Sequence, residues 1–253
     1  MLHLTDSDGI ACLRIEHGKA NALDLELVRA LADTLVELEH HEARALVLTG
    51  SGHIFSAGVD LTRVLAGGAG YVREFLPAMT TAFRRLFSFS RPVIAAVNGH
   101  AIAGGCVLAM ACDYRLMARG PGTIGVPELR VGVPFPLVAI EILRFATSTA
   151  HLQELVYRGS TYPVEEAHER GLIDEVVAGE DLLERARAVA QGLAREPAAR
   201  FRLTKRQLRA PTLATVERDA RETDYEVLAV WTRPETVAAI RTYLDDLKRD
   251  RGR

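Results

Sequence analysis

The stretch that says most about the fold is Pro92-Val-Ile-Ala-Ala-Val-Asn-Gly-His-Ala-Ile-Ala-Gly-Gly-Cys-Val-Leu-Ala-Met-Ala-Cys-Asp113. Residues 93–97 are all apolar and are bounded by a proline and by Asn98-Gly99, which is typical of a buried strand. Residues 98–103 form a tight connection. Residues 104–111 have no polar face, so we expect a helix that is buried on every side. The stretch therefore predicts a strand, a turn and a helix inside the core.

Two glycines, Gly104 and Gly105, stand at the start of this predicted helix. One interpretation is that they only let the helix pack closely against a strand. The other is chemical, because glycine lets a ligand approach the backbone. The first N–H groups of a helix have no intrahelical partner and lie at the positive end of the helix dipole. Such an end can hold an anion or a developing oxyanion, and the stretch by itself leaves both interpretations open.

The rest of the chain alternates between strand and helix patterns. Strands are expected at residues 10–15, 45–49, 114–118 and 172–177, and helices at 25–40, 71–88, 137–145 and 161–171. Residues 123–134 have an irregular pattern. From residue 181 the pattern is almost wholly helical, with breaks near Pro197, Pro211 and Pro234. This order predicts an α/β fold, with a core over residues 1–190 and a helical region over residues 191–253.

The composition is that of an ordinary globular protein. The chain has 253 residues, of which 48% are hydrophobic and 25% are charged, and its net charge of −2 predicts no nucleic-acid partner. The three cysteines lie in apolar runs without CxxC spacing, which favours reduced thiols in the core. The first residues lack the pattern of a signal peptide, and no apolar run has membrane-spanning length. We therefore expect a cytoplasmic protein without a membrane span.

Several motifs suggest other chemistry, and each fails a test of spacing. Neither glycine-rich connection, 50–58 or 99–105, has the pattern of a dinucleotide or phosphate-binding loop. Ser56 lacks the glycine two positions earlier that a nucleophile elbow needs. His40-His41-Glu42 lacks the spacing of a zinc motif, so we expect no metal. One basic run is either a solvated helix face or a partner for phosphates, and it consists of Arg200, Arg202, Lys205, Arg206 and Arg209.

A set of separate motifs resembles the enoyl-CoA hydratase/isomerase family, the crotonases. The matching segments are Phe55-Ser-Ala-Gly-Val-Asp-Leu61, Ala96-Val-Asn-Gly99, Ala103-Gly-Gly-Cys106, Cys112-Asp-Tyr-Arg115, and a Glu-Ala-x-x-x-Gly-Leu-x-Asp-x-Val pattern within residues 161–177. They occur in the family's order and cover nearly the whole chain. The resemblance implies a spiral of ββα units followed by a helical region used in trimer formation. It also implies an acyl-CoA thioester as substrate, with coenzyme A as part of that substrate and no separate cofactor.

The resemblance further implies an oxyanion hole made by two backbone N–H groups. By position they belong to Val59, which follows Ala57-Gly58, and to Gly104. Each such donor can contribute about 3–4 kcal/mol to stabilising an enolate-like transition state. Other residues are expected to line the substrate site, namely Ala57, Gly58, Asp60, Gly105, Val107, Pro127 and Phe135. Asp60 also suits the cap of a following helix.

The family's hydratases carry two glutamates, and this chain keeps one of them. Val107 stands at the first position and Glu128 at the second. Valine cannot deprotonate water, whereas moving a double bond from C3 to C2 needs only one base within reach of C2 and C4. The pattern therefore resembles the Δ3,Δ2-enoyl-CoA isomerases, with Glu128 as general acid/base and Glu141 as a rival acid that more simply forms a salt bridge. The alternatives are an enoyl-CoA hydratase with one glutamate and a CoA-thioester-binding protein without turnover.

The helical region has apolar positions that a monomer would be expected to expose, including Leu228, Val230, Trp231, Ile240 and Leu244. Exposed apolar patches usually mark interfaces. Together with the resemblance, these positions predict a homotrimer or a dimer of trimers.

Overall fold

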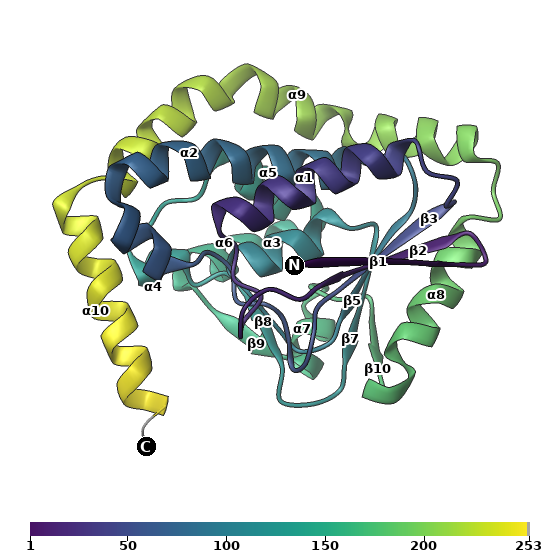
Figure 1. The fold of residues 1–253 in the computed structure, drawn as a ribbon, viewed down its shortest axis with the longest axis horizontal. Helices are drawn as coiled ribbons and strands as arrows, with labels where there is room; N and C mark the ends of the chain where they lie inside the picture. The colour runs from purple at the N-terminus through teal and green to yellow at the C-terminus, as the bar shows by residue number, and fades with distance from the viewer. Residues whose placement is uncertain (252–253) are drawn as a thin grey trace.

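The computed structural model of the protein describes residues 1–251 and contains two sheets with helices on both sides (Figure 1). The larger sheet has the order β1-β2-β3-β5-β7-β10, and only β1 is antiparallel to its neighbour. Its strands are β1 (Leu2–Ser7), β2 (Ile10–Ile15), β3 (Ala45–Thr49), β5 (Val93–Val97), β7 (Tyr114–Ala118) and β10 (Glu175–Val177). The smaller sheet consists of β4 (Ile54–Ser56), β6 (His100–Ile102), β8 (Thr123–Gly125) and the antiparallel β9 (Thr161–Pro163).

A unit of two strands and one helix occurs three times along the chain. The units are β3-β4 with α2 (Leu61–Ser88), β5-β6 with α3 (Gly104–Ala111), and β7-β8 with α4 (Glu128–Val131). In each unit the first strand joins the larger sheet and the second joins the smaller one. Because β4, β6 and β8 pair in parallel, the three connections from strand to helix lie side by side. The predicted spiral of ββα units is therefore present.

The larger sheet is covered on both faces by apolar side chains. Successive residues of a strand point to opposite faces. In β3, Leu46 and Leu48 face the main core together with α1 (Leu25–Glu39) and α2, while Val47 faces the second core with α8 (Leu182–Leu193). Figure 1 shows α1 and α2 on one side of the sheet and α8 on the other. Two-sided burial explains why the strand patterns are continuous apolar runs and not alternating ones.

The remaining helices are α5 (Leu137–Ala146), α6 (Thr149–Arg158), α7 (Val164–Glu169), the short 3₁₀ helix η1 (Gly179–Asp181), α9 (Ala198–Trp231) and α10 (Pro234–Arg251). Residues 123–134 are not irregular, because they contain β8 and α4. The helix expected from residue 71 begins at Leu61 and is kinked at Gly68, whose φ of 58° interrupts the helical geometry. The strand expected over residues 172–177 is limited to β10.

The predicted helix break at Pro211 is wrong, because α9 runs through this residue. A proline inside a helix removes one hydrogen bond and usually kinks or ends the helix. Here Arg209 and Val216 are buried on either side of Pro211. Their contacts with the core hold α9 together across the proline.

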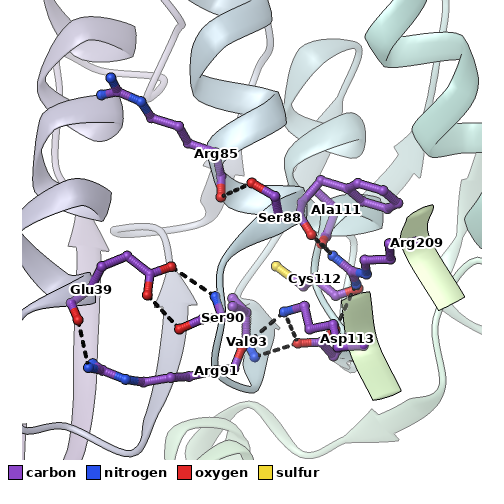
Figure 2. A network of polar contacts seen from close by, with 12 residues as sticks. Glu39, Arg85, Ser88, Ser90, Arg91, Val93, Ala111, Cys112, Asp113 and Arg209 are labelled. Carbon is purple, nitrogen blue, oxygen red and sulfur yellow. Dashed lines mark hydrogen bonds and ion pairs between the residues drawn. The ribbon is translucent and has the colours of Figure 1, made fainter. Parts of the chain in front are cut away.

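The helical C-terminal region is attached to the core through a buried carboxylate, Asp113, which follows α3 (Figure 2). Arg209 of α9 donates to Asp113 Oδ1 at 2.7 Å and to the carbonyl of Ala111 at 2.9 Å. Lys205 donates to Asp113 Oδ2 at 2.6 Å and to the carbonyl of Arg91. Burial lowers the pKa of Lys205 to about 8, and the nearby carboxylate opposes that shift. Two members of the predicted basic run are therefore structural, while Arg200, Arg202 and Arg206 are exposed.

The apolar positions of the C-terminal region do not all face outward. Trp231 is 2% exposed and Ile240 is 0% exposed, because both pack inside their own chain. The premise that a monomer would expose them is wrong for these two residues. Tyr225 and Leu208 of α9 are exposed apolar residues, which an interface would cover. The homotrimer stays a prediction. Among residues 1–251, none of the helices combines the length and hydrophobicity that crossing a bilayer requires, and the cytoplasmic location stays a prediction.

Candidate active site

Three consecutive strand-to-helix connections meet at the carboxyl ends of β4, β6 and β8. The first loop is residues 57–60, the second is residues 103–105, and the third contains Pro127 and Glu128. Ligands of α/β proteins commonly bind at the carboxyl ends of parallel strands. The spiral therefore brings the three predicted catalytic positions, Val59, Gly104 and Glu128, to one place.

The first loop is fixed by the segment before α1. Leu23 donates its N–H to the carbonyl of Gly58 at 2.7 Å and accepts the N–H of Asp60 at 2.9 Å. In this parallel bridge the N–H of Val59 is directed away from Leu23. Gly58 has a φ of 79°, which glycine adopts without strain. The loop thus presents the Val59 N–H, and no hydrogen bond within residues 1–251 uses that donor.

The second loop presents the start of α3. Ala103 adopts a φ of 54°, which is rare for a residue with a Cβ and marks local strain. Gly104 follows as the first residue of the helix, so its N–H has no intrahelical acceptor and lies at the positive end of the dipole. A Cβ on Gly58 would lie 3.0 Å from the Gly104 nitrogen and 2.6 Å from the Ala103 Cβ. The two loops are therefore in direct contact, and glycine at 58 allows it.

The third loop holds the backbone of Glu128 from both sides. The N–H groups of Gly132 and Val133 both donate to the carbonyl of Glu128 at 3.0 Å. Gly132 ends the single turn of α4 with a φ of 92°. Before the turn, Val126 donates its N–H to the carbonyl of Ser160, which ties the loop to the segment leading into β9. The backbone of Glu128 is therefore held in place by the hydrogen bonds of this turn.

These loops line an apolar inner cavity of about 60 Å³. Its wall combines the three loops with side chains from α2, α5, α9, α10 and the segment after α4. The lining residues are Ala57, Val59, Leu61, Met79, Phe83, Ile102, Ala103, Gly104, Val107, Pro127, Glu128, Val131, Val133, Pro134, Phe135, Pro136, Ala139, Trp231 and Tyr243. The only carboxylate in this lining is that of Glu128.

Glu128 is the most perturbed carboxyl group of the site. Its Oε2 atom is buried and has no hydrogen-bond partner among residues 1–251. Loss of water raises the pKa of Glu128 to about 8, because the charged form is disfavoured in apolar surroundings. The pKa of Cys106 is also raised, first by burial and then by the nearby charge of Glu128. A carboxyl group with a pKa near neutrality suits a general acid/base.

Because the pKa of Glu128 is raised in the folded state, the stability of the protein should fall as the pH rises. In the folded state this group keeps its proton up to a pH of about 8, whereas in the unfolded state it ionises near 4.5. Between these pH values the wild type should lose stability relative to Glu128→Gln, by up to about 1.4 kcal/mol per pH unit. Below the unfolded pKa the two proteins should differ by a constant amount. Urea unfolding of both proteins from pH 4 to pH 9 measures this change in the free energy of unfolding. If the wild type and Glu128→Gln differ by the same amount at every pH, the pKa of Glu128 is not raised.

A larger outer cavity of about 1060 Å³ opens onto the inner one. The mouth between them is formed by the residues that line both, namely Ala57, Val59, Leu61, Ile102, Pro127 and Tyr243. Three basic side chains, Lys19, Arg130 and Arg249, line the outer cavity together with Asp60 and Asp246. The site therefore consists of a small apolar chamber and a wide, charged entrance.

Most of the predicted site residues lie at these two cavities, but they do not all line the same one. Ala57, Val107, Pro127 and Phe135 line the inner cavity beside the three catalytic positions. Gly58 and Gly105 do not line it, and a Cβ on Gly105 would lie 2.2 Å from the carbonyl oxygen of Ser56. These two glycines are close-packing positions. Asp60 lines the outer cavity.

The rival residues have structural contacts. Asp60 caps α2 by accepting the N–H groups of Thr62 at 2.9 Å and Arg63 at 3.0 Å, as the helix-cap interpretation predicted. Glu141 is outside the cavity lining and pairs with Arg144 at 3.0 Å. Ser56 is fully buried and donates to the carbonyl of Asn21 at 2.7 Å, so it holds a loop. None of the three competes with Glu128 inside the chamber.

Two aromatic residues of the site, Trp231 and Tyr243, were missed by the sequence interpretation. The sequence pattern places Trp231 at an interface and gives Tyr243 no role. Both lie more than a hundred residues after the catalytic loops, and no local pattern connects them with those loops.

Comparison with known proteins gives the same family over nearly the whole chain. The family model for enoyl-CoA hydratase/isomerase matches residues 5–248. Human mitochondrial enoyl-CoA delta isomerase 1 is 29% identical over 250 residues, which cover 96% of this chain and 82% of the human protein. A putative enoyl-CoA hydratase of Thermus thermophilus is 34% identical over 196 residues, covering 76% of this chain and 77% of that protein.

The fold is also that of solved members. The crystal structure of human mitochondrial delta3-delta2-enoyl-CoA isomerase matches with a TM-score of 0.93 and 26% identity, covering 98% of each chain. Agreement over both the ββα spiral and the C-terminal helices confirms the predicted crotonase fold. The chain belongs to the enoyl-CoA hydratase/isomerase family.

Proposed function

We propose that the protein is an enoyl-CoA isomerase, which shifts a double bond of an acyl-CoA thioester from C3 to C2. The observation that carries this proposal is the presence of Glu128 as the sole carboxylate in the lining of the inner cavity, with Val107 at the other expected position. Two positioned groups are useful for adding water, whereas one base suffices for moving a proton between two carbons.

The reaction follows from the arrangement of the three loops. The thioester oxygen accepts the N–H groups of Val59 and Gly104. Ionised Glu128 removes a proton from C2, and the electron pair moves into the thioester carbonyl to give a dienolate. The two N–H groups and the dipole of α3 stabilise the negative oxygen. Protonated Glu128 then delivers the proton to C4, and the double bond comes to rest between C2 and C3.

The apolar chamber favours each of these steps. A carboxylate that has lost its water is a stronger base than one in solution, and burial accordingly raises the pKa of Glu128. Exclusion of water strengthens the interaction between the N–H groups and the oxyanion. The same exclusion protects the dienolate from protonation by solvent. These properties suit proton transfer between carbons.

The CoA part of the substrate would occupy the outer cavity. Phosphate groups are strongly anionic, and Lys19, Arg130 and Arg249 line this entrance. Arg249 also pairs with Asp246 at 3.1 Å, so Lys19 and Arg130 are the more available cations. The acyl end would pass the mouth and reach Glu128. The thioester then lies between the two loops at the mouth.

A hydratase with one glutamate is the alternative, and the name of the Thermus thermophilus relative gives it some support. The valine at position 107 of the cavity lining speaks against it, because its side chain has no polar atom that could orient or deprotonate an attacking water. A binding protein without turnover is disfavoured by Glu128 itself. An unpaired buried carboxyl group costs stability and is retained most simply for its chemistry.

Product analysis tests the proposed reaction. Incubation with a 3-enoyl-CoA, followed by NMR of the product, should show the conjugated 2-enoyl-CoA. The control is the same incubation with heat-inactivated protein. Unchanged 3-enoyl-CoA with native protein would reject the proposal.

A further inference from the structure

The largest side chain in the lining of the inner cavity is that of Trp231, at the end of α9. This residue lines only the inner cavity and takes no part in the mouth. Its indole Nε1–H donates to the carbonyl of Pro134 at 2.9 Å, and its side chain is almost fully buried. A tryptophan with a satisfied N–H and packed faces has little freedom to swing away. The wall is therefore fixed in position.

The elements around Trp231 strengthen this wall. Asp224, two turns earlier in α9, accepts the N–H of Leu137 at 2.9 Å and so holds the first turn of α5. Helix α5 contributes Ala139 to the same cavity, and Pro134 and Pro136 stiffen the segment between α4 and α5. The Asp113 network of Figure 2 anchors the other end of α9 to the core. Helix α9, helix α5 and the segment between α4 and α5, which line this side of the cavity, are therefore linked to one another.

The volume of the chamber sets how much acyl chain it can hold. A cavity of about 150 Å³ holds the six carbons of benzene, which corresponds to about 25 Å³ per carbon. The inner cavity of about 60 Å³ has room for about two or three carbons by the same measure. Val59 and Gly104 fix the thioester carbon and Glu128 fixes C2 to C4, so a longer chain has to extend farther into this chamber. Its far carbons would meet the indole.

We propose that Trp231 sets the upper limit of acyl chain length and makes the protein selective for short acyl-CoA thioesters, of about four carbons, since the mouth holds the thioester carbon and the chamber about three more. This inference rests on the proposed function only for the position of the thioester at the two loops. It concerns the binding of the acyl chain, so it can be tested without turnover.

The test measures the affinity of saturated acyl-CoAs of four, six, eight and ten carbons by calorimetry. A methylene that finds apolar space strengthens binding by about fourfold. For the wild type we expect the affinity to stop rising beyond about four carbons. Trp231→Leu should open the wall and raise the affinity for the ten-carbon ligand, relative to the four-carbon one, by at least about tenfold. Trp231→Phe keeps most of the bulk and controls for loss of the Pro134 hydrogen bond.

Ala139→Leu supplies the opposite change from the facing helix. It should weaken binding of the six-carbon ligand relative to the four-carbon one by about tenfold or more. This variant keeps the inference testable if Trp231→Leu does not fold, which far-ultraviolet circular dichroism would show. A wild type that prefers ten carbons would overturn the inference. So would a folded Trp231→Leu with the wild-type profile, or an unchanged profile in Ala139→Leu.

The outcomes separate this inference from the proposed function. Binding of short acyl-CoAs without isomerisation would reject the proposed reaction and leave the chain-length limit standing. Isomerisation of long and short substrates with equal specificity constants would reject the chain-length limit and leave the proposed reaction standing. Absence of acyl-CoA binding to the wild type would reject both.

Discussion

Replacing Glu128 by glutamine should lower the rate of double-bond isomerisation by about 10²–10⁴-fold, the usual contribution of a general acid/base. Glutamine keeps the shape of the side chain and removes its ability to accept the C2 proton. The affinity for a saturated acyl-CoA should change little, because glutamine fills the same part of the cavity lining. Steady-state kinetics with a 3-enoyl-CoA and calorimetry with the saturated analogue measure the two effects.

Glu141→Gln is the matched control for this experiment. Glu141 is also a buried acid, it lies thirteen positions later, and it pairs with Arg144 outside the cavity. The same substitution there should leave the specificity constant within a few-fold of the wild type. If Glu128→Gln keeps activity within a few-fold, or if both variants lose activity equally, Glu128 is not the base.

Replacing Gly104 by proline should lower turnover by about 10²–10³-fold, which is the usual effect of losing one oxyanion-hole donor. The donor is a backbone N–H, so only proline removes it. Proline is tolerated sterically at the first position of a helix, where the N–H has no helical acceptor. The measurement is kcat for a 3-enoyl-CoA, together with the affinity for a saturated acyl-CoA as a check on folding.

Gly104→Ala separates the lost N–H from the added side chain. A Cβ at this position would meet the end of the Leu23 side chain at 2.8 Å and the Phe83 ring at 3.4 Å, and Leu23 can give way. Alanine should therefore cost much less than proline. Equal losses in the two variants would show that crowding, and not the N–H, explains the effect.

The sequence predicts the second of the three loops from local pattern alone. A buried strand, a glycine-containing connection and a following helix are all readable within about twenty residues, as at residues 93–111. Val59 and Glu128 are identified through the family resemblance, and the parallel pairing of β4, β6 and β8 places their loops beside that of Gly104. The helix-end argument at Gly104 and the cap at Asp60 depend only on neighbouring residues, and the structure agrees with both.

Features that depend on distant packing could not be read in this way. The strands β4, β6, β8 and β9 have three residues each, so their patterns are too short to identify. The single turn of α4 is stabilised by its connections and not by its own sequence. Trp231 has an apolar helical position that fits an interface as well as a core, and only the path of α9 decides between them. The sequence also predicts a helix break at Pro211, but buried contacts on both sides of this residue outweigh the tendency of proline to end a helix.

We propose that one carboxylate beside an apolar chamber suits this chain to isomerisation and not to hydration. The most direct test is the ratio of two specificity constants of the wild type, measured with a short 3-enoyl-CoA and with the 2-enoyl-CoA of the same length. Losing one general acid/base group, as Val107 implies, should slow hydration by about 100-fold or more. We therefore predict isomerisation at least about 100-fold faster than hydration. Hydration as fast as isomerisation, or faster, would contradict the account and would require a group other than Glu128 to activate the water.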